Sequence, residues 1–168
     1  FVALPLYVLL PNHYAREFGV PLAALGSLLL GARLFDAVLD PWLGRVSDRL
    51  FARSPAAVLR FGSAAALVLA IGFALLFFPP VRATAALLAW AGLVLLATSL
   101  AFSALAIAHQ SWGAMLGGTE VQRSRIVAWR EGWGLLGVLL ASVLPLVAGL
   151  GVTAAVLALA LVGGWLAW

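Results

Sequence analysis

The sequence contains no cysteine and no lysine. Without cysteine the chain forms neither a disulfide nor a thiolate metal site, and its two histidines, His13 and His109, lie too far apart to indicate a metal cluster. Charge is also scarce, because only 10% of the residues are charged, whereas a soluble domain has about 25%. These shortages exclude a disulfide-stapled domain and leave too little polar surface for a water-soluble one.

Apolar residues are abundant instead. They make up 65% of the sequence and give a mean hydropathy of +1.13, whereas soluble domains are about 45–50% apolar. The composition therefore predicts an all-α integral membrane protein whose first partner is the lipid bilayer. All ten basic residues are arginines, and the formal net charge is +4. They gather near particular connections rather than along one stripe, so we do not expect nucleic acid as a partner.

The apolar runs predict six membrane-spanning helices, since a span needs about 20 mostly apolar residues. Pro21 suits the first position of the second helix, and Pro79 and Pro80 end the third. A basic loop through Pro55 is expected to follow the second helix. Because both ends of the chain lie inside apolar runs, we expect a six-helix piece that is truncated at both ends. The predicted helices cover residues 1–15, 21–45, 56–78, 83–108, 124–147 and 151–168.

Arginine asymmetry predicts the orientation of these helices. Seven arginines lie in or beside the connections after the second and fourth helices, and two lie in the other connections. The positive-inside rule therefore places the connections after helices two and four in the cytoplasm, and we expect a bacterial inner (plasma) membrane. The seven are Arg45, Arg49, Arg53, Arg60, Arg123, Arg125 and Arg130, and the two are Arg16 and Arg82.

Asp36 and Asp40 lie inside the second predicted span. A charge in hydrocarbon costs roughly 3 kcal/mol or more and survives mainly where it lines a cavity or binds a ligand. At about 100° per residue the two carboxylates and Arg33 share one helix face. We expect this face to line a wet passage and to bind Na⁺ or carry a proton. Two alternatives stay open: Arg33 pairs with Asp36 and merely neutralises it, and Pro41 either exposes a backbone carbonyl as a further ligand or only kinks the helix.

A second motif follows on the same helix. Gly44, Asp48 and Arg49 form Gly-x-x-x-Asp-Arg-x-x-x-Arg at its cytoplasmic end, which resembles the loop motif of the major facilitator superfamily. The preceding Arg-x-x-Asp-x-x-x-Asp-Pro-x-x-Gly, residues 33–44, is similar to the glycoside–pentoside–hexuronide:cation symporters, the family of melibiose permease. A patch around Ser111, Trp112 and Arg130 occurs at the corresponding places of helices four and five.

This resemblance implies the N-terminal half of a twelve-helix secondary transporter, with the C-terminal half of the same chain as its partner. It assigns Asp36 and Asp40 to the cation site, and Trp112 and Arg130 to a bound sugar or related small solute. An indole face stacks on a pyranose, and a guanidinium donates paired hydrogen bonds to hydroxyls. Arg33 would tune the carboxylates and contribute to binding the solute, while Gly44, Asp48 and Arg49 would form the cytoplasmic gate. No cofactor is implied beyond the coupling Na⁺ or H⁺.

The sequence departs from that family at one place. The acid that the family carries four residues before the helix-four tryptophan falls on Ala108 here. His109 is adjacent, and we consider it as a proton relay or a donor to the solute, with local hydration as the alternative. An uncoupled or proton-coupled carrier of another solute therefore stays open, as do a non-transporting sensor or scaffold on the same fold and a half-size transporter that dimerises.

A membrane enzyme is the remaining class. Intramembrane aspartyl proteolysis needs carboxylates that face each other across helices, whereas Asp36 and Asp40 are stacked on one helix. The sequence shows no serine–histidine or metal arrangement either. We therefore predict a transporter and not an enzyme.

Overall fold

The computed structural model describes residues 1–115 and 119–167. These residues are helical apart from short connections and contain no strand, which confirms the all-helical fold predicted from composition. Helices α2 to α6 are each long and apolar enough to cross a membrane. The elements are a π-helical turn η1 (Pro5–Leu9), α1 (Leu10–Phe18), α2 (Leu22–Arg53), α3 (Pro55–Phe77), α4 (Thr84–Met115), α5 (Glu120–Val147) and α6 (Gly149–Ala167).

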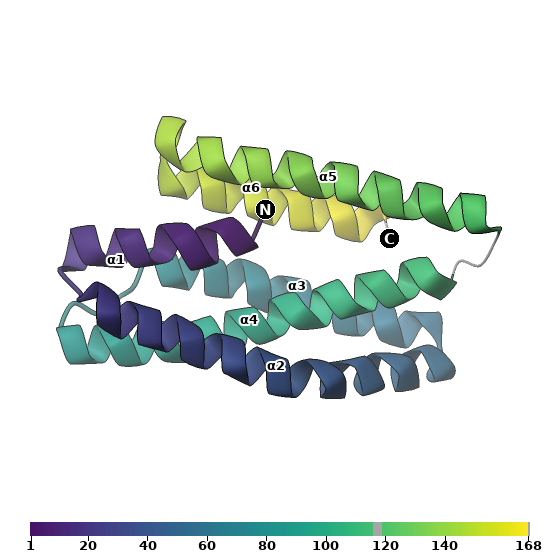
Figure 1. The fold of residues 1–168 in the computed structure, drawn as a ribbon, viewed down its shortest axis with the longest axis horizontal. Coiled ribbons are helices and arrows are strands. Elements are labelled where there is room, and N and C mark those ends of the chain that lie inside the picture. Colours follow the sequence, from purple (N-terminus) through teal and green to yellow (C-terminus); the bar gives the residue numbers. More distant parts are fainter. Residues whose placement is uncertain (116–118, 168) are drawn as a thin grey trace.

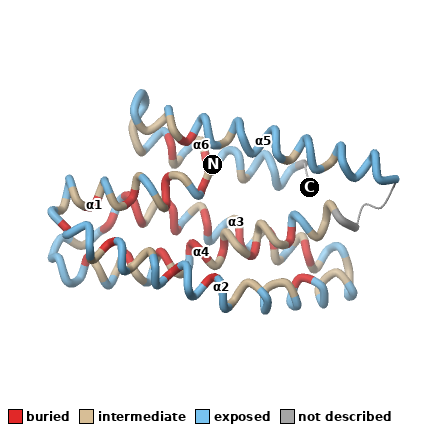
Figure 2. The backbone as a smooth tube through the Cα atoms, in the orientation of Figure 1, coloured by how far each residue is buried: buried red, intermediate tan, exposed pale blue. Residues whose placement is uncertain are grey.

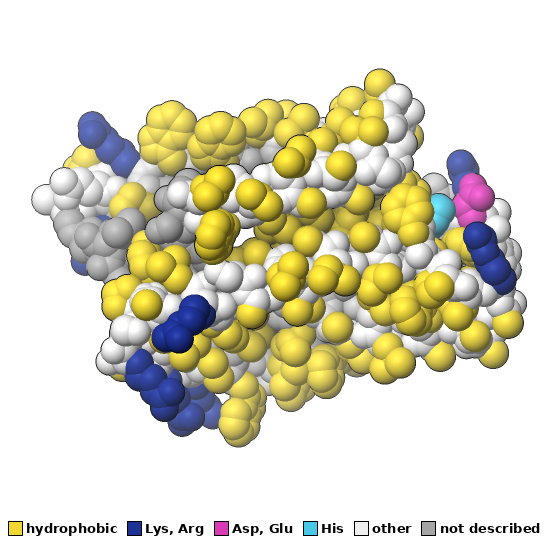
Figure 3. Space-filling model, turned by 180° about the vertical axis from the view of Figure 1, so that it is seen from behind, with side chains coloured by type: hydrophobic (Ala, Val, Ile, Leu, Met, Phe, Trp, Pro, Cys, Tyr) yellow, Lys and Arg dark blue, Asp and Glu magenta, His cyan; other side chains and the backbone are white. Residues whose placement is uncertain are grey.

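Successive helices run up and down (Figure 1). The α2–α3 and α4–α5 connections lie at one end of the bundle, and the other three connections lie at the opposite end. We call the first of these the basic end, because Arg49, Arg53, Arg60, Arg123 and Arg125 lie in the helix segments that meet there. Figure 3 shows arginine side chains toward the two ends of the molecule and hydrophobic side chains over the face between them. This is the distribution that a bilayer requires of a spanning bundle.

The core lies among α1, α2, α3 and α4, with α6 packed against α3. Its fully buried side chains include Leu6, Tyr14, Leu69, Phe73 and Leu95. Helix α5 packs mainly on α6, and Ala141 is the buried residue among those described on α5. Figure 2 shows the contrast, with buried positions along α1, α3 and α4 and an almost wholly exposed α5. In a bilayer the apolar faces of α2 and α5 meet lipid or protein rather than water.

Close packing of α3 on α4 depends on a glycine. A Cβ added at Gly72 would collide with Thr98 Oγ1, which is held in place by donating to the Val94 carbonyl at 2.6 Å. Gly72 is buried, and Thr98 is fully buried. Small residues at such crossings let two helix backbones approach each other in a membrane. The α3–α4 pair is therefore a tightly specified contact at the centre of the bundle.

Three side chains complete the end of α3 that faces away from the basic end. The last carbonyls of a helix have no partner within it. Here three successive carbonyls accept side-chain hydrogen bonds, which ties α1 and α4 to this end of α3. The pairs are Trp90 Nε1 with Leu75 O (3.2 Å), the Tyr14 hydroxyl with Leu76 O (2.8 Å) and His13 Nε2 with Phe77 O (3.2 Å).

The predicted boundary of the second helix was wrong. Helix α2 continues past residue 45 to Arg53, so the basic loop expected through Pro55 is reduced to a corner at Ser54. Residues 46–53 contain neither glycine nor proline, and their charges do not interrupt a helix. Ser54 ends α2 and begins α3, because its hydroxyl accepts the Ala57 amide at 3.2 Å.

Other boundaries also differ from the prediction. Helix α4 runs to Met115 rather than to 108, and α5 begins at Glu120 rather than 124, because Thr119 and Gln122 form a reciprocal capping box. Gly117 and Gly118, which lie in the connection between α4 and α5, are outside the described residues. The first helix extends to Phe18 and ends at Gly19, whose φ of 66° suits glycine. Pro21 precedes α2 as its N-cap rather than opening it.

Candidate functional site

The buried face of α2 changes character along its length. Toward its start this face carries Leu25 and Ala32, and further toward the basic end it carries Asp36, Asp40 and Ser47. At about 100° per residue these five positions fall within roughly 80° of the helix circumference. Asp36 retains 7% of its exposure and Ser47 none, while Asp40 is half-buried. We call Asp36, Asp40 and Ser47 the polar face of α2.

The polar face has buried oxygens without partners. Asp36 Oδ1, Asp40 Oδ1 and Ser47 Oγ are each inaccessible and accept or donate no hydrogen bond within the described structure. A buried carboxylate without a hydrogen bond or counter-charge costs several kcal/mol, so such groups normally neutralise or bind a ligand. Helix α2 packs chiefly on α4 and also on α1 and α3, so the polar face lies toward the bundle. It is not turned toward lipid.

Within the described residues Arg33 forms no salt bridge with either carboxylate. Its Cζ lies 3.7 Å from the centroid of the Tyr7 ring, and the ion pair that the described residues form is Arg130 with Glu131. The alternative in which Arg33 and Asp36 pair with each other is therefore not the arrangement adopted. Arg33 is exposed on α2, yet it shares the sector of the helix that carries Asp40.

Pro41 lies between these carboxylates and the basic end, and α2 passes through it as one helix. Proline has no amide hydrogen, so the Ala37 carbonyl lacks its usual α-helical donor. Among residues 1–115 and 119–167 no group of three or more His, Cys, Asp or Glu is arranged to hold a metal. The hard oxygen ligands one turn apart on this face of α2 are therefore the two carboxylates, Asp36 and Asp40.

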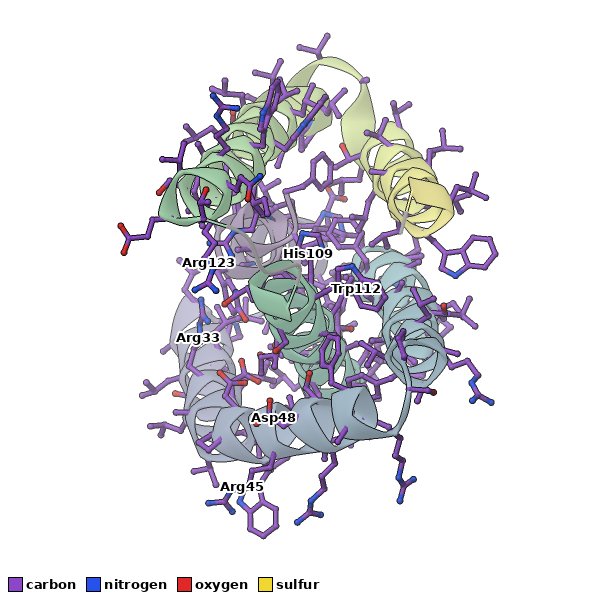
Figure 4. All side chains as sticks on the ribbon, turned by 90° about the vertical axis from the view of Figure 1, so that its right-hand side faces the viewer. Arg33, Arg45, Asp48, His109, Trp112 and Arg123 are labelled. Atoms are coloured by element: carbon purple, nitrogen blue, oxygen red, sulfur yellow. The ribbon has the colours of Figure 1, made fainter. Side chains whose placement is uncertain are left out.

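A second polar region lies at the basic end between α4 and α5. A cavity of about 740 Å³ is lined there by His109, Trp112, Trp129, Trp133 and Arg130, among others. Figure 4 looks at the molecule from this end and labels His109 and Trp112 on α4 and Arg123 on α5, which also contributes to the lining. Three of the four residues predicted to bind the solute, His109, Trp112 and Arg130, therefore share one cavity, and the fourth, Arg33, does not line it.

This cavity is separate from the polar face. The ring of Trp112 packs on that of Phe51, with centroids 5.8 Å apart. Phe51 lies eleven residues beyond Asp40 on α2, which is about 16 Å along a helix axis. Neither cavity described here is lined by Asp36 or Asp40. The structure thus places His109, Trp112 and Arg130 around one cavity, away from the carboxylates predicted to bind the cation.

Two cavity residues have other contacts as well. Arg130 Nη2 donates to Glu131 Oε1 at 2.8 Å, although neighbours in a helix point about 100° apart. His109 also lines a second, largely apolar cavity of about 450 Å³ between α3, α4 and α6. Ala108, where the resembling family carries an acid, is fully buried.

Comparison with protein families decides the identity of the chain. A family model described as MFS/sugar transport protein matches residues 1–167. The chain belongs to this family. It is a membrane transporter of the major facilitator kind, which agrees with its spanning helices. Comparison with curated proteins found no match. Comparison with solved structures found no match either.

The predicted gate of this transporter lies inside α2. Asp48 and Arg49 are exposed in the last turns of the helix, and neither forms an ion pair within the described residues. Figure 4 shows Asp48 on α2 and Arg45 on the outer side of the same helix, where Arg45 Cζ lies 5.4 Å from the Trp42 ring. A Cβ added at Gly44 would meet nothing within 4 Å. Within the described residues no other helix therefore packs closely against Gly44.

Residue-by-residue reasoning missed two contributors to the transporter's polar centre. Ser47 lies eleven residues from Asp36, a spacing that returns to the same helix face, so the sequence did contain its signal. Tyr7 holds Arg33 and places its hydroxyl 3.3 Å from Ser99 Oγ. No sequence signal pairs these residues, because they lie on η1, α2 and α4.

Proposed function

We propose that this chain is the N-terminal half of a symporter that couples the uptake of a sugar or related small solute to a cation. The observation that carries the proposal is the polar face of α2. Three buried oxygens of Asp36, Asp40 and Ser47 point into the bundle without partners, in a family of membrane transporters. Groups of this kind inside a spanning helix mark ion or substrate pathways.

The coupling cation is proposed to bind at Asp36 and Asp40. Carboxylate oxygens are hard ligands that suit Na⁺, and either carboxylate can instead take up a proton. Arg33 lies on Tyr7 in this structure, which leaves the two carboxylates as the local excess of negative charge. The positive charge of Arg33 remains close enough to tune how strongly they attract a cation.

The solute is proposed to enter the cavity at the basic end. Its volume of about 740 Å³ falls in the range of about 300–1,000 Å³ that small-molecule sites occupy. Trp112 offers an aromatic face for a sugar ring, and Arg130 and His109 offer donors for hydroxyl or anionic groups. The cavity lies between α4 and α5, so a relative movement of these helices changes its width.

Transport is proposed to follow alternating access. In this mechanism two halves rock about a site between them, and the exposed apolar faces of α2 and α5 are surfaces that a second half can cover. The basic end is proposed to be cytoplasmic. Asp48 and Arg49, which have no ion-pair partner among residues 1–115 and 119–167, would then latch the cytoplasmic side against the other half, with Gly44 at the contact.

The test is uptake by the full-length protein in vesicles, with and without a Na⁺ gradient and with and without a pH gradient. Asp40→Asn is expected to abolish the cation dependence while the protein still inserts in the membrane. Glu17→Gln is the matched control, because Glu17 is an exposed acid outside the polar face. The proposal would be refuted if uptake of every sugar in a panel were unchanged by both gradients, or if the Asp40→Asn variant kept the cation dependence of the wild type.

A further inference from the structure

The first helical segment contains a π-helical turn, Pro5–Leu9, in which the Leu10 amide donates to the Pro5 carbonyl. Pro11 has no amide hydrogen for the Tyr7 carbonyl, which explains why α-helical bonding is interrupted just before it. Single π turns inside helices occur frequently at functional sites. The residue in the middle of this turn is Tyr7, and its side chain contacts two other helices.

Tyr7 joins α2 and α4 in different ways. Its ring lies under the guanidinium of Arg33 on α2, with Cζ 3.7 Å from the ring centroid. Its hydroxyl lies 3.3 Å from Ser99 Oγ on α4, and Ser99 is fully buried. The hydrogen bond orients the ring, and the ring then holds the cation on its face. Arg33 is therefore held by an aromatic side chain and not by an acid.

The alternative partners of Arg33 are close at hand. Asp36 follows it by three residues and Asp40 by seven, spacings that bring side chains to one side of a helix. Both carboxylates keep an unpartnered buried oxygen. Between Arg33 and Asp40 the only other charged residue on α2 is Asp36, so no second arginine or lysine in this segment of the helix competes with Arg33 for these acids. The contact that keeps the guanidinium elsewhere is the one with Tyr7.

We infer that Tyr7 is a positioning residue for the cation site: it holds Arg33 on its ring and so keeps Asp36 and Asp40 free for a cation. The inference rests on the proposed cation coupling. Arg33 has two arrangements, one on Tyr7 with the carboxylates open and one on the carboxylates with the site closed by an internal positive charge. A cation binds the open arrangement only, so its apparent affinity is reduced by the fraction of molecules that are closed.

The size of the effect follows from the contact that is lost. Removing the ring removes a cation–π contact, which shifts the equilibrium toward the closed arrangement by about 3- to 30-fold for an exposed to a desolvated cation. Apparent cation affinity falls by up to this factor, and by the whole of it only if the closed arrangement already dominates in the wild type. The KM for the solute at saturating cation stays unchanged, because saturating cation restores the open arrangement.

The experiment is a double-mutant cycle in the full-length protein, measured as the cation concentration that half-saturates uptake, for whichever of Na⁺ and H⁺ drives the wild type. The ring-free variant is Tyr7→Leu, and Tyr7→Gln replaces it if Tyr7→Leu does not insert. Tyr7→Phe keeps the ring and is expected to retain most of the affinity. Both ring-free variants are combined with Arg33→Gln, in which no guanidinium remains to close the site.

The expected result is a loss of apparent cation affinity of more than about twofold and up to about 30-fold in the ring-free variants that carry Arg33, and a change of less than about twofold in the Arg33→Gln background. An equal loss in both backgrounds would show a merely structural role for Tyr7 and overturn the inference alone. A loss in Tyr7→Phe as large as in Tyr7→Leu would also overturn it. Uptake that depends on no cation at all would overturn both the inference and the proposed function.

Discussion

Replacing Asp36 by asparagine is expected to make the cation-free transporter more stable. Asp36 retains 7% of its exposure, and its Oδ1 has no hydrogen-bond partner. Asp40 lies one turn away, and two ionised carboxylates about 6 Å apart repel each other by about 3 kcal/mol at an effective dielectric constant of about 20. Partial protonation and water reduce this penalty, so we expect a gain of about 1–3 kcal/mol in unfolding free energy.

Binding of the coupling cation is expected to cancel this difference in stability between the variant and the wild type. A ligand at a hundred times its Kd stabilises the folded state by about 2.7 kcal/mol. The wild type is therefore expected to gain this amount on adding the coupling cation, and Asp36→Asn is expected to gain much less. Without cation the variant unfolds at the higher temperature, and with saturating cation its advantage disappears. The substitution removes a destabilising charge and a binding group together.

The assay is thermal unfolding of the protein in detergent, followed by intrinsic fluorescence, for which the sequence supplies seven tryptophans. At about 2–4 °C per kcal/mol, the scale for domains of 150–250 residues, the expected rise is about 2–12 °C. Glu17→Gln is the control for removing an exposed acid. An Asp36→Asn variant that unfolds at a lower temperature than the cation-free wild type would refute the reasoning, because it would show that the carboxylate has a stabilising partner.

Two predictions concern the fold around this site. Gly72→Ala is expected to destabilise the bundle by about 1–3 kcal/mol, because the added Cβ collides with Thr98. Gly163→Ala is the control and is expected to be neutral, because a Cβ there meets open space. Equal unfolding temperatures for the two variants would contradict the close α3–α4 packing at Gly72. Tyr14→Phe removes the donor to the Leu76 carbonyl and is expected to cost about 1–3 kcal/mol, because that carbonyl is then left without its side-chain donor. Faster amide exchange at the end of α3 is the accompanying measurement, and unchanged exchange would show that another group completes this helix end.

Helix ends illustrate how local signals succeed and fail. The third helix was predicted to within a residue, since Ser54, Pro55 and the Pro79–Pro80 pair are strong local punctuation. The second and fourth helices were predicted too short, because charged or polar residues near a membrane surface were interpreted as loop. Helix formation does not require apolar residues, so α2 extends through its charged segment to Arg53. Hydropathy marks the part of a helix that lies in lipid, not the whole helix.

The candidate site, like the helix ends, was predicted only in part from local sequence signals. Asp36 and Asp40 were predicted on one face, and the structure places both on the buried side of α2. The prediction that they line an accessible passage remains a prediction. His109, Trp112 and Arg130 do share a cavity, but their separation from the carboxylates depends on how far α4 continues. That length was not visible in the apolar run alone.

The sequence by itself determined that this protein is a helical bundle in a bilayer and that two acids share one face of its second helix. Both properties are local: hydrocarbon selects apolar runs of sufficient length, and helical periodicity assigns residues to faces. Only the tertiary structure decided that Arg33 lies on Tyr7 rather than on its neighbouring acids, and that Ser47 joins them without a partner. These outcomes depend on contacts between helices that are distant in the sequence. Helical spacing alone allows Arg33 to reach Asp36 or Asp40, and the packing of Tyr7, which lies on a π turn, decides which partner it contacts.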